Sequence, residues 1–105
     1  MRTRLPEPEL IESTRVEEPP RAMAKFSPTY PRSLLRQRGG GRVIIRPVVE
    51  PDGPVGEARV KERSGHAELD RAAIKAIGRW RYRPARNGGH VVRATVIQPF
   101  NFKVP

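Results

Sequence analysis

The sequence has no cysteine and few aromatic residues, and these shortages narrow what the protein can do. Its 105 residues include one Trp, two Tyr and three Phe. Without cysteine the chain cannot form a disulfide, a thiolate nucleophile or a zinc–thiolate site. It also lacks an apolar run near the roughly 20 residues of a membrane-spanning helix, and its start has no apolar segment typical of a signal peptide. The length suits one small domain.

Positive charge is what the sequence has in excess. There are 21 Lys and Arg residues against 11 Asp and Glu, which gives a formal net charge of +10. Charges of the two signs balance over residues 1–25, so the whole excess belongs to residues 26–105. Such a surface favours anionic partners, which include nucleic acid, acidic lipid, acidic polysaccharide and acidic protein.

The first 25 residues have the composition of a linker. Pro6, Pro8, Pro19 and Pro20 are interleaved with Glu and Arg, a mixture that cannot bury a core and favours extended chain. We therefore predict a disordered Pro/Glu-rich linker over residues 1–25 and a folded domain over residues 26–105.

The folded part has the pattern of an α+β domain. A short helix is predicted around Leu34, followed by two strands at 43–50 and 55–63 on either side of the turn "PDGP". An amphipathic helix is predicted within 64–84, and a final strand over 90–102. The expected fold is a short helix, a β-hairpin, an amphipathic helix and a final strand, with a three-stranded antiparallel sheet and the helices packed on one face.

The pattern of the amphipathic helix indicates whether the single Trp belongs to a binding surface or to the core. Its predicted apolar face consists of Leu69, Ala73, Ala76, Ile77 and Trp80. Large aromatic residues dominate small cores, so Trp80 is interpreted as a core anchor and Tyr82, just beyond the helix, is expected to be partly exposed.

Three basic residues follow one another at four-residue steps on the other side of this helix. Arg71, Lys75 and Arg79 form either a solvated helix face or an anion-contact surface, and the sequence leaves both open.

The final strand alternates between two faces. Core-facing side chains are predicted at Val92, Ala94, Val96, Phe100 and Phe102. Arg93, Thr95 and Ile97 are expected to face the other way.

Catalytic and metal-binding patterns are weak. Ser64, His66 and Asp70 have the residue types of a hydrolase triad, but their close spacing favours a turn that leads into the helix. His66, Glu68 and His90 do not have metal-ligand spacing. The glycines in "RQRGGGR" are interpreted as a connecting loop. We therefore predict no catalytic residue, no metal and no cofactor.

Eight short pieces of the sequence together resemble the C-terminal domain of TonB, the energy transducer of Gram-negative envelopes. In order they are "YP" (30–31), "GRV" (41–43), "DG" (52–53), "SG" (64–65), "LDRAA" (69–73), "RWRYRP" (79–84), "GG" (88–89) and "PFNF" (99–102). No piece is specific alone, but the ordered set spans about the last 80 residues near the family's spacing.

Two departures from the family pattern matter. Pro47 lies in a strand that the resemblance makes central, where its missing N–H predicts a bulge or a local gap in strand pairing. Gly39 and Gly40 replace the bulkier residues that the family usually has before Gly41, so a more mobile loop is expected there. The N-terminal membrane anchor of TonB proteins is expected to lie outside this chain.

The resemblance implies a non-enzymatic periplasmic protein that transmits force. A TonB domain grips a short extended segment, the TonB box, of an outer-membrane transporter by strand addition, and the inner-membrane motor of ExbB and ExbD drives uptake of substrates such as iron siderophores. On that basis the docking residues are predicted to be the exposed last strand and one helix residue: Val92, Arg93, Ala94, Thr95, Val96, Ile97, Gln98 and Leu35. Pro99 is expected to end the docking register. Simple packing is the alternative for Leu35, and a solvated strand residue for Arg93. Homodimer formation through the same edge is also consistent with an exposed strand.

A second hypothesis is a small basic domain that binds nucleic acid or an anionic envelope polymer such as peptidoglycan or lipopolysaccharide. Net charge supports it. Nucleic acid is disfavoured because RNA-binding sheets display aromatic residues on an open face, whereas Phe100 and Phe102 share the predicted core face.

Overall fold

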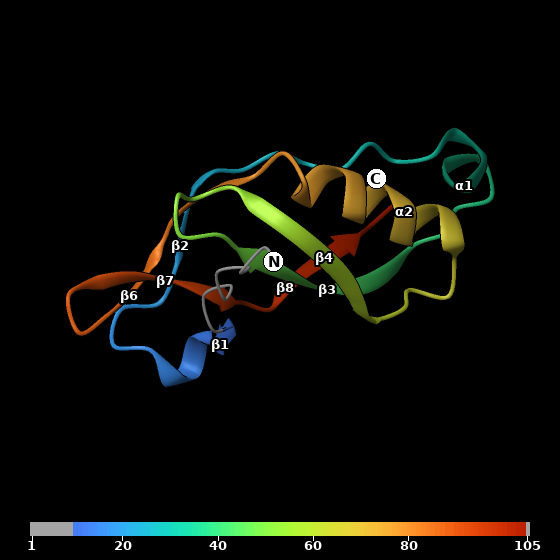
Figure 1. Ribbon diagram of the computed structural model, residues 1–105. Coiled ribbons are helices and arrows are strands. Elements are labelled where there is room, and N and C mark those ends of the chain that lie inside the picture. Colours follow the sequence, from blue (N-terminus) through green and yellow to red (C-terminus); the bar gives the residue numbers. More distant parts are fainter. Residues whose placement is uncertain (1–9, 105) are drawn as a thin grey trace, which may run out of the picture.

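A computed structural model describes residues 10–104 (Figure 1). These residues form a twisted sheet with one long helix against one of its faces, and they measure 54 × 34 × 20 Å. Its elements are β1 (Leu10–Glu12), a 3-10 turn (Ser13–Arg15), β2 (Arg21–Ala24), α1 (Arg32–Arg36), β3 (Gly41–Val49), β4 (Val55–Glu62), α2 (Ala67–Ile77), β5 (Arg81–Arg83), β6 (Ala85–Asn87), β7 (His90–Thr95) and β8 (Gln98–Phe102). Neither helix in this part of the chain has the length and apolar character that a membrane crossing needs.

The predicted β-hairpin is confirmed as β3 and β4. These strands are antiparallel, and the turn between them is closed by hydrogen bonds from the Gly53 N–H to the Glu50 carbonyl (2.9 Å) and from the Glu50 N–H to the Pro54 carbonyl (2.9 Å). Gly53 has φ +107°, a left-handed conformation that glycine adopts without a steric penalty. The "PDGP" signal therefore marks a real turn.

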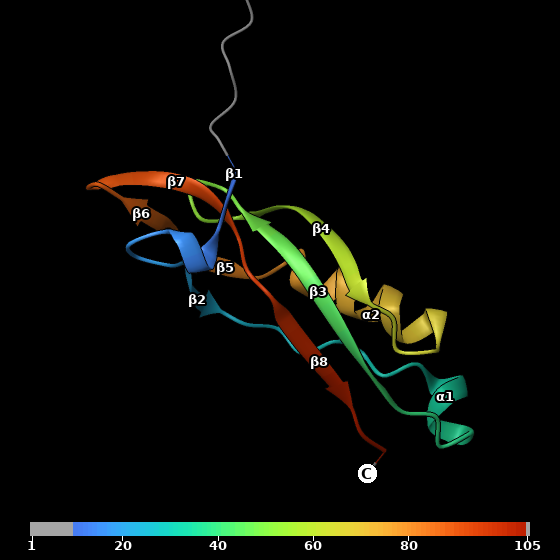
Figure 2. The ribbon, with the colours of Figure 1, turned by 90° about the horizontal axis from the view of Figure 1, so that it is seen from below.

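The predicted three-stranded sheet is wrong in size. The main sheet has six strands, with β1, β7, β3 and β4 in that order, β6 paired with β7, and β8 paired with β3 (Figure 2). β2 and β5 form a separate two-stranded sheet. The predicted final strand is divided into β7 and β8, and β1, β2, β5 and β6 come from segments too short or too charged to give a strand pattern in the sequence.

The predicted final strand is present as two strands on the same side of β3. Ile45 lies opposite Gln98 in β8, and Val48 lies opposite Thr95 in β7, so one continuous register runs through both. The interruption falls at Pro47, whose carbonyl accepts a hydrogen bond from the Val96 N–H (3.2 Å) but whose ring nitrogen has no hydrogen to return one. The pairing of β3 with β4 also shifts register beside Pro47. The predicted bulge or gap is therefore confirmed.

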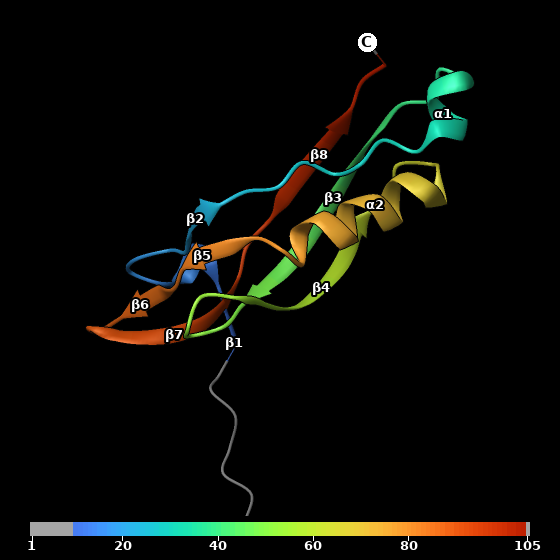
Figure 3. The same cartoon turned by 90° about the horizontal axis from the view of Figure 1, so that it is seen from above.

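Helix α2 covers one face of the β3–β4 pair, with α1 beside its N-terminal end (Figure 3). Leu69, Ala73 and Ile77 are fully buried on the predicted apolar face. The helix is shorter than predicted because it ends at Ile77, followed by Gly78. Arg79 and Trp80 consequently lie beyond it.

Trp80 is confirmed as a core anchor, although it is not a helical residue. Its side chain is buried, and its indole N–H donates to the Phe26 carbonyl at 2.9 Å. Its ring meets Phe100 edge-on, with the centroids 5.6 Å apart. Tyr82 is buried as well, which corrects the expectation of partial exposure: β5 turns its side chain into the core beside Trp80.

The predicted disordered linker differs from the structure over residues 10–25. β1 pairs with β7, and β2 pairs with β5. No side chain of β1 is buried, so main-chain pairing with β7 holds this strand in place. In β2, Ala22 also packs against the hydrophobic core. Residues 1–9 lie outside the described residues. The division into a linker and a domain stays a prediction.

Candidate functional site

The outer edge of β7 is the candidate site. The Val96 N–H donates to the Pro47 carbonyl of β3, so it points toward β3. Successive N–H groups along a strand point to opposite edges. Arg93 and Thr95 therefore direct their main-chain groups away from β3. We call this side the docking edge, defined by residues 93–95. It is the edge where another strand can continue the sheet.

A strand already lies along the docking edge. Leu10, Ile11 and Glu12 of β1 pair in parallel with Arg93, Ala94 and Thr95 (Figure 2). The edge therefore has the geometry to accept an extended segment in the parallel direction.

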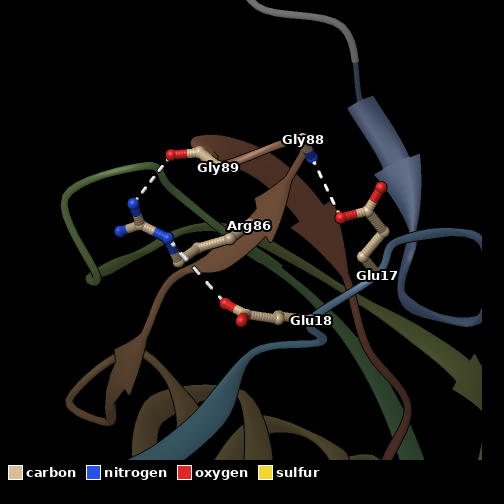
Figure 4. Close-up of polar contacts among 5 residues, drawn as sticks. All are labelled: Glu17, Glu18, Arg86, Gly88 and Gly89. Atoms are coloured by element: carbon tan, nitrogen blue, oxygen red, sulfur yellow. Dashed lines mark hydrogen bonds and ion pairs between the residues drawn. The ribbon is translucent and has the colours of Figure 1, made fainter.

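The residues after β1 cross beside the β6–β7 hairpin and reach β6 (Figure 4). The Glu18 and Arg86 main chains exchange two hydrogen bonds of 3.0 and 2.9 Å, and a Glu17 carboxylate oxygen accepts from the Gly88 N–H at 3.2 Å. Arg86 also reaches the Gly89 carbonyl at 2.7 Å and the Glu18 carboxylate at 3.8 Å. We call residues 10–18 the N-terminal clasp, because they contact β7 on one side and β6 on the other.

Arg93 is held by an acidic neighbour on the same face of the sheet. Its Nε lies 3.1 Å from a Glu50 carboxylate oxygen, and both side chains are largely shielded from solvent, with 20% and 29% exposed. Gly56 leaves the space for this carboxylate, because a Cβ there would lie 2.3 Å from the same oxygen. The pair fixes the Arg93 side chain beside the docking edge.

A groove of about 420 Å³ lies on the sheet face opposite α2 and borders the docking edge. Its lining residues are Leu10, Glu12, Arg46, Val48, Glu57, Arg59 and Thr95.

Two arginines oppose each other across this groove. Arg46 and Arg59 are direct cross-strand partners, an arrangement of like charges that is unfavourable by itself. Glu57 offsets it at 2.8 Å from Arg59, and Glu12 lies 4.0 Å from Arg46. The groove thus offers an apolar floor at Val48 and a preference for an acidic group at its rim.

The structure distributes the predicted docking residues over two strands and the link between them. Val92 to Thr95 belong to β7, Val96 and Ile97 form the link, and Gln98 begins β8. Ala94 faces the core and Ile97 is 48% exposed, in agreement with the predicted alternation. Thr95 is 8% exposed although it faces away from the core, because β1 lies beside it.

Pro99 does not interrupt the pairing of this strand with β3, and its predicted end of the docking register, on the outer edge, stays a prediction. It lies opposite Ile44, and pairing continues to Phe102. By the same alternation, Pro99 faces the outer edge, where it lacks a donor. Its effect is therefore confined to that side.

Leu35 and the basic residues lie away from the docking edge. Leu35 is half-buried in α1, which lies at the opposite end of the molecule from β7 (Figure 1). Arg71, Lys75 and Arg79 are exposed, and the Arg79 guanidinium lies over the Phe26 ring, 4.4 Å from its centroid.

The Ser64, His66 and Asp70 group is a turn, as predicted. The Ser64 hydroxyl exchanges hydrogen bonds with the main chain of His66 (2.9 and 3.1 Å) and not with its imidazole. The Asp70 carboxylate accepts from the Ser64 N–H at 2.9 Å. These contacts fix the start of α2, and His90 lies apart from them at the start of β7.

Sequence reasoning missed the clasp and the acidic partners of the arginines. β1 is three residues long, too short for a period of two to be visible, and the surrounding Pro and Glu residues favour a linker. Glu50 follows a strand and precedes a turn, and nothing local indicates that Arg93 is its partner. The only signal was "LIE" itself, an apolar pair within an acidic, proline-rich segment.

Comparison with known proteins places most of the chain in one family. The family described as Gram-negative bacterial TonB protein C-terminal matches residues 27–104. Protein tonB2 of Pseudomonas aeruginosa is 36% identical over 78 residues, which is 74% of this chain and 29% of that protein. Protein TonB of Escherichia coli is 32% identical over 79 residues, 75% of this chain and 33% of that protein. The chain thus spans about a third of the length of these relatives.

A solved structure agrees with the fold. The solution NMR structure of the Pseudomonas aeruginosa TonB C-terminal domain superposes with a TM-score of 0.65 at 29% sequence identity, covering 81% of this chain and 86% of that one. The family match begins at residue 27, so the clasp lies before it.

Proposed function

This chain belongs to the family of Gram-negative bacterial TonB C-terminal domains, and from that premise we propose that it is a non-enzymatic, periplasmic docking module of an energy transducer. It captures the TonB box of an outer-membrane TonB-dependent transporter by strand addition. Through an inner-membrane anchor, ExbB and ExbD supply force from the proton motive force, and the transporter imports cargo such as iron siderophores.

One observation carries this proposal: β7 already pairs in parallel with a separate extended segment along its outer edge. Main-chain hydrogen bonds provide the affinity in this kind of recognition, and side-chain pockets provide specificity. The docking edge supplies the main-chain hydrogen bonds, and the adjoining groove with Arg46 and Val48 supplies the side-chain pocket.

Residues 92–98 are the proposed contact segment, and Arg93 is the proposed side-chain contact. A peptide carboxylate near Arg93 would compete with Glu50, which lies 3.1 Å away. The proposed contribution of Leu35 is weaker, because α1 is far from β7.

The basic surface has a supporting role in this proposal. A net charge of +10 attracts acidic groups on periplasmic plugs, peptidoglycan or lipopolysaccharide, and it raises the association rate more than the affinity.

An NMR titration of the isotope-labelled chain with a synthetic TonB-box peptide tests the proposal, at low and at high salt. We expect the amides of residues 92–98 to shift at both salt concentrations, because main-chain pairing is less sensitive to salt than phosphate contacts are. A peptide with a central proline is the control, since it lacks a strand donor.

Two matched variants separate a side-chain contact from general charge. Arg93→Gln and Arg71→Gln each remove one positive charge, but only Arg93 lies beside the docking edge. We expect weaker peptide binding for Arg93→Gln alone. If amides near Arg71, Lys75 and Arg79 respond instead, and salt abolishes the response, an anionic polymer is the partner and strand capture is refuted.

A further inference from the structure

We propose that residues Leu10–Glu12 are a built-in competitor that occupies the docking edge until a partner strand displaces them. This inference rests on the proposed function, because it concerns the regulation of the same edge. Its starting point is the parallel pairing of β1 with the residues that the partner would use.

The register of β1 shows what this edge accepts. Leu10 and Glu12 line the groove on the sheet face opposite α2, where Leu10 lies with Val48 and Glu12 lies 4.0 Å from Arg46. β1 therefore places an apolar residue at the groove and an acidic residue two positions later. A displacing strand of the same pattern, apolar–any–acidic, reproduces both contacts and again offsets the opposed pair of Arg46 and Arg59.

β1, the first part of the clasp, is attached weakly enough to leave the docking edge. None of the β1 side chains is buried, and Leu10 is 45% exposed. The ion pair of Glu12 with Arg46 spans 4.0 Å between side chains that are 62% and 43% exposed, and exposed pairs of this kind contribute little. Few apolar contacts and exposed hydrogen bonds are the features of segments that open locally.

The clasp is also held close enough to compete. Glu17 and Glu18 tie it to the hairpin at Gly88 and Arg86, so β1 stays near the edge after it detaches. A tethered segment has a high effective concentration, which a free partner must overcome. A partner's apparent affinity falls in proportion to the fraction of time that the edge is uncovered.

Ile11 is the position at which to test this. In the parallel ladder Ile11 lies opposite Ala94. The main-chain groups of Arg93 and Thr95 on either side of Ala94 point toward β1, so the Ile11 N–H points toward β7 to meet them. Ile11→Pro removes that donor from the centre of β1. Ile11→Val keeps the N–H and the β-branched side chain.

The first readout is hydrogen exchange of the Thr95 amide in the 105-residue chain. We expect Ile11→Pro to raise the exchange rate about tenfold or more, because an edge that β1 covers about nine-tenths of the time would then be open all the time. Ile11→Val should leave the rate unchanged. Equal rates in the two variants would overturn the proposal, because β1 would then not cover the edge. Unchanged amide shifts in α2 and β3 show that Ile11→Pro remains folded.

The second readout is binding of two peptides to the same variants. A peptide that copies residues 7–14 should bind Ile11→Pro at the amides of residues 93–95 and should not bind the unaltered chain. A TonB-box peptide should bind Ile11→Pro about tenfold more tightly than the unaltered chain or Ile11→Val.

The outcomes separate this inference from the proposed function. If the TonB-box peptide shifts the β7 amides of the unaltered chain and of Ile11→Pro with equal affinity, strand capture stands and the competitor is refuted. If the copy of residues 7–14 binds Ile11→Pro and the TonB-box peptide binds neither protein, the built-in occupant of the edge is upheld and the transporter partner is refuted.

Discussion

Removing the hydroxyl of Tyr82 should stabilise this protein, and more strongly at alkaline pH. The Tyr82 side chain is buried, and its hydroxyl is the one buried side-chain polar atom without a hydrogen-bond partner among residues 10–104. Leaving such a group unsatisfied costs about 1–3 kcal/mol. We therefore expect Tyr82→Phe to raise the free energy of unfolding by about 1 kcal/mol at pH 7.

The pH dependence follows from the same burial. Desolvation raises the pKa of Tyr82 from 10.0 to about 12. The unfolded chain therefore loses the phenolic proton first, and the stability present in full below pH 10 falls as the pH rises toward 12. The loss is about 1 kcal/mol at pH 11 and approaches about 3 kcal/mol above pH 12. Tyr82→Phe has no proton to lose, so its advantage over the unaltered chain widens by that amount.

Urea unfolding followed by Trp80 fluorescence at pH 7 and pH 11 measures both effects. Tyr30→Phe is the matched control, because the Tyr30 hydroxyl donates to the Gly39 carbonyl and its removal should destabilise the fold by about 1 kcal/mol at pH 7. A Tyr82→Phe protein that is less stable than the unaltered chain at pH 7 would refute the unsatisfied hydroxyl. A difference that stays constant between pH 7 and pH 11 would refute the raised pKa.

Three further predictions concern other parts of the fold. Pro47→Val supplies a main-chain donor opposite Val96, and we expect slower hydrogen exchange in residues 95–98. Stability should change little, because a gain of about 1 kcal/mol from the new hydrogen bond is offset by the greater freedom of the unfolded chain without proline. Unchanged exchange would contradict this. Gly53→Ala should destabilise by at least about 2 kcal/mol in urea unfolding, because φ is +107° and the new Cβ would lie 2.6 Å from the Tyr82 carbonyl oxygen; a neutral effect would be inconsistent with this turn. Trp80→Phe should cost about 2–3 kcal/mol in thermal unfolding through the lost indole hydrogen bond and the cavity, and a loss under 1 kcal/mol would show that Trp80 is not an anchor.

Much of the fold follows from local patterns. Leu69, Ala73 and Ile77 repeat at helical spacing and are fully buried in α2, and the turn around Gly53 joins β3 to β4 as its residue types indicate. The helix end was placed too late, because the buried position of Trp80 continues the helical period after the backbone has left the helix.

The candidate site was predictable only in part. Alternation along residues 92–102 identifies which side chains face the core, and the missing N–H of Pro47 predicts the interruption in pairing. The pairing of Leu10 with Arg93 and the contact of Glu17 with Gly88 join the two ends of the chain. Contacts of that kind depend on tertiary position and leave no periodic signal in so short a segment.

A partner strand is proposed to add to the outer edge of β7. The most direct measurement is a set of intermolecular NOEs between the isotope-labelled chain and an unlabelled TonB-box peptide. We predict main-chain contacts with Arg93, Ala94 and Thr95 in a parallel register, together with loss of the contacts between β1 and β7. Peptide contacts along β4, or at the exposed side chains of α2, with β1 still paired to β7, would contradict the account.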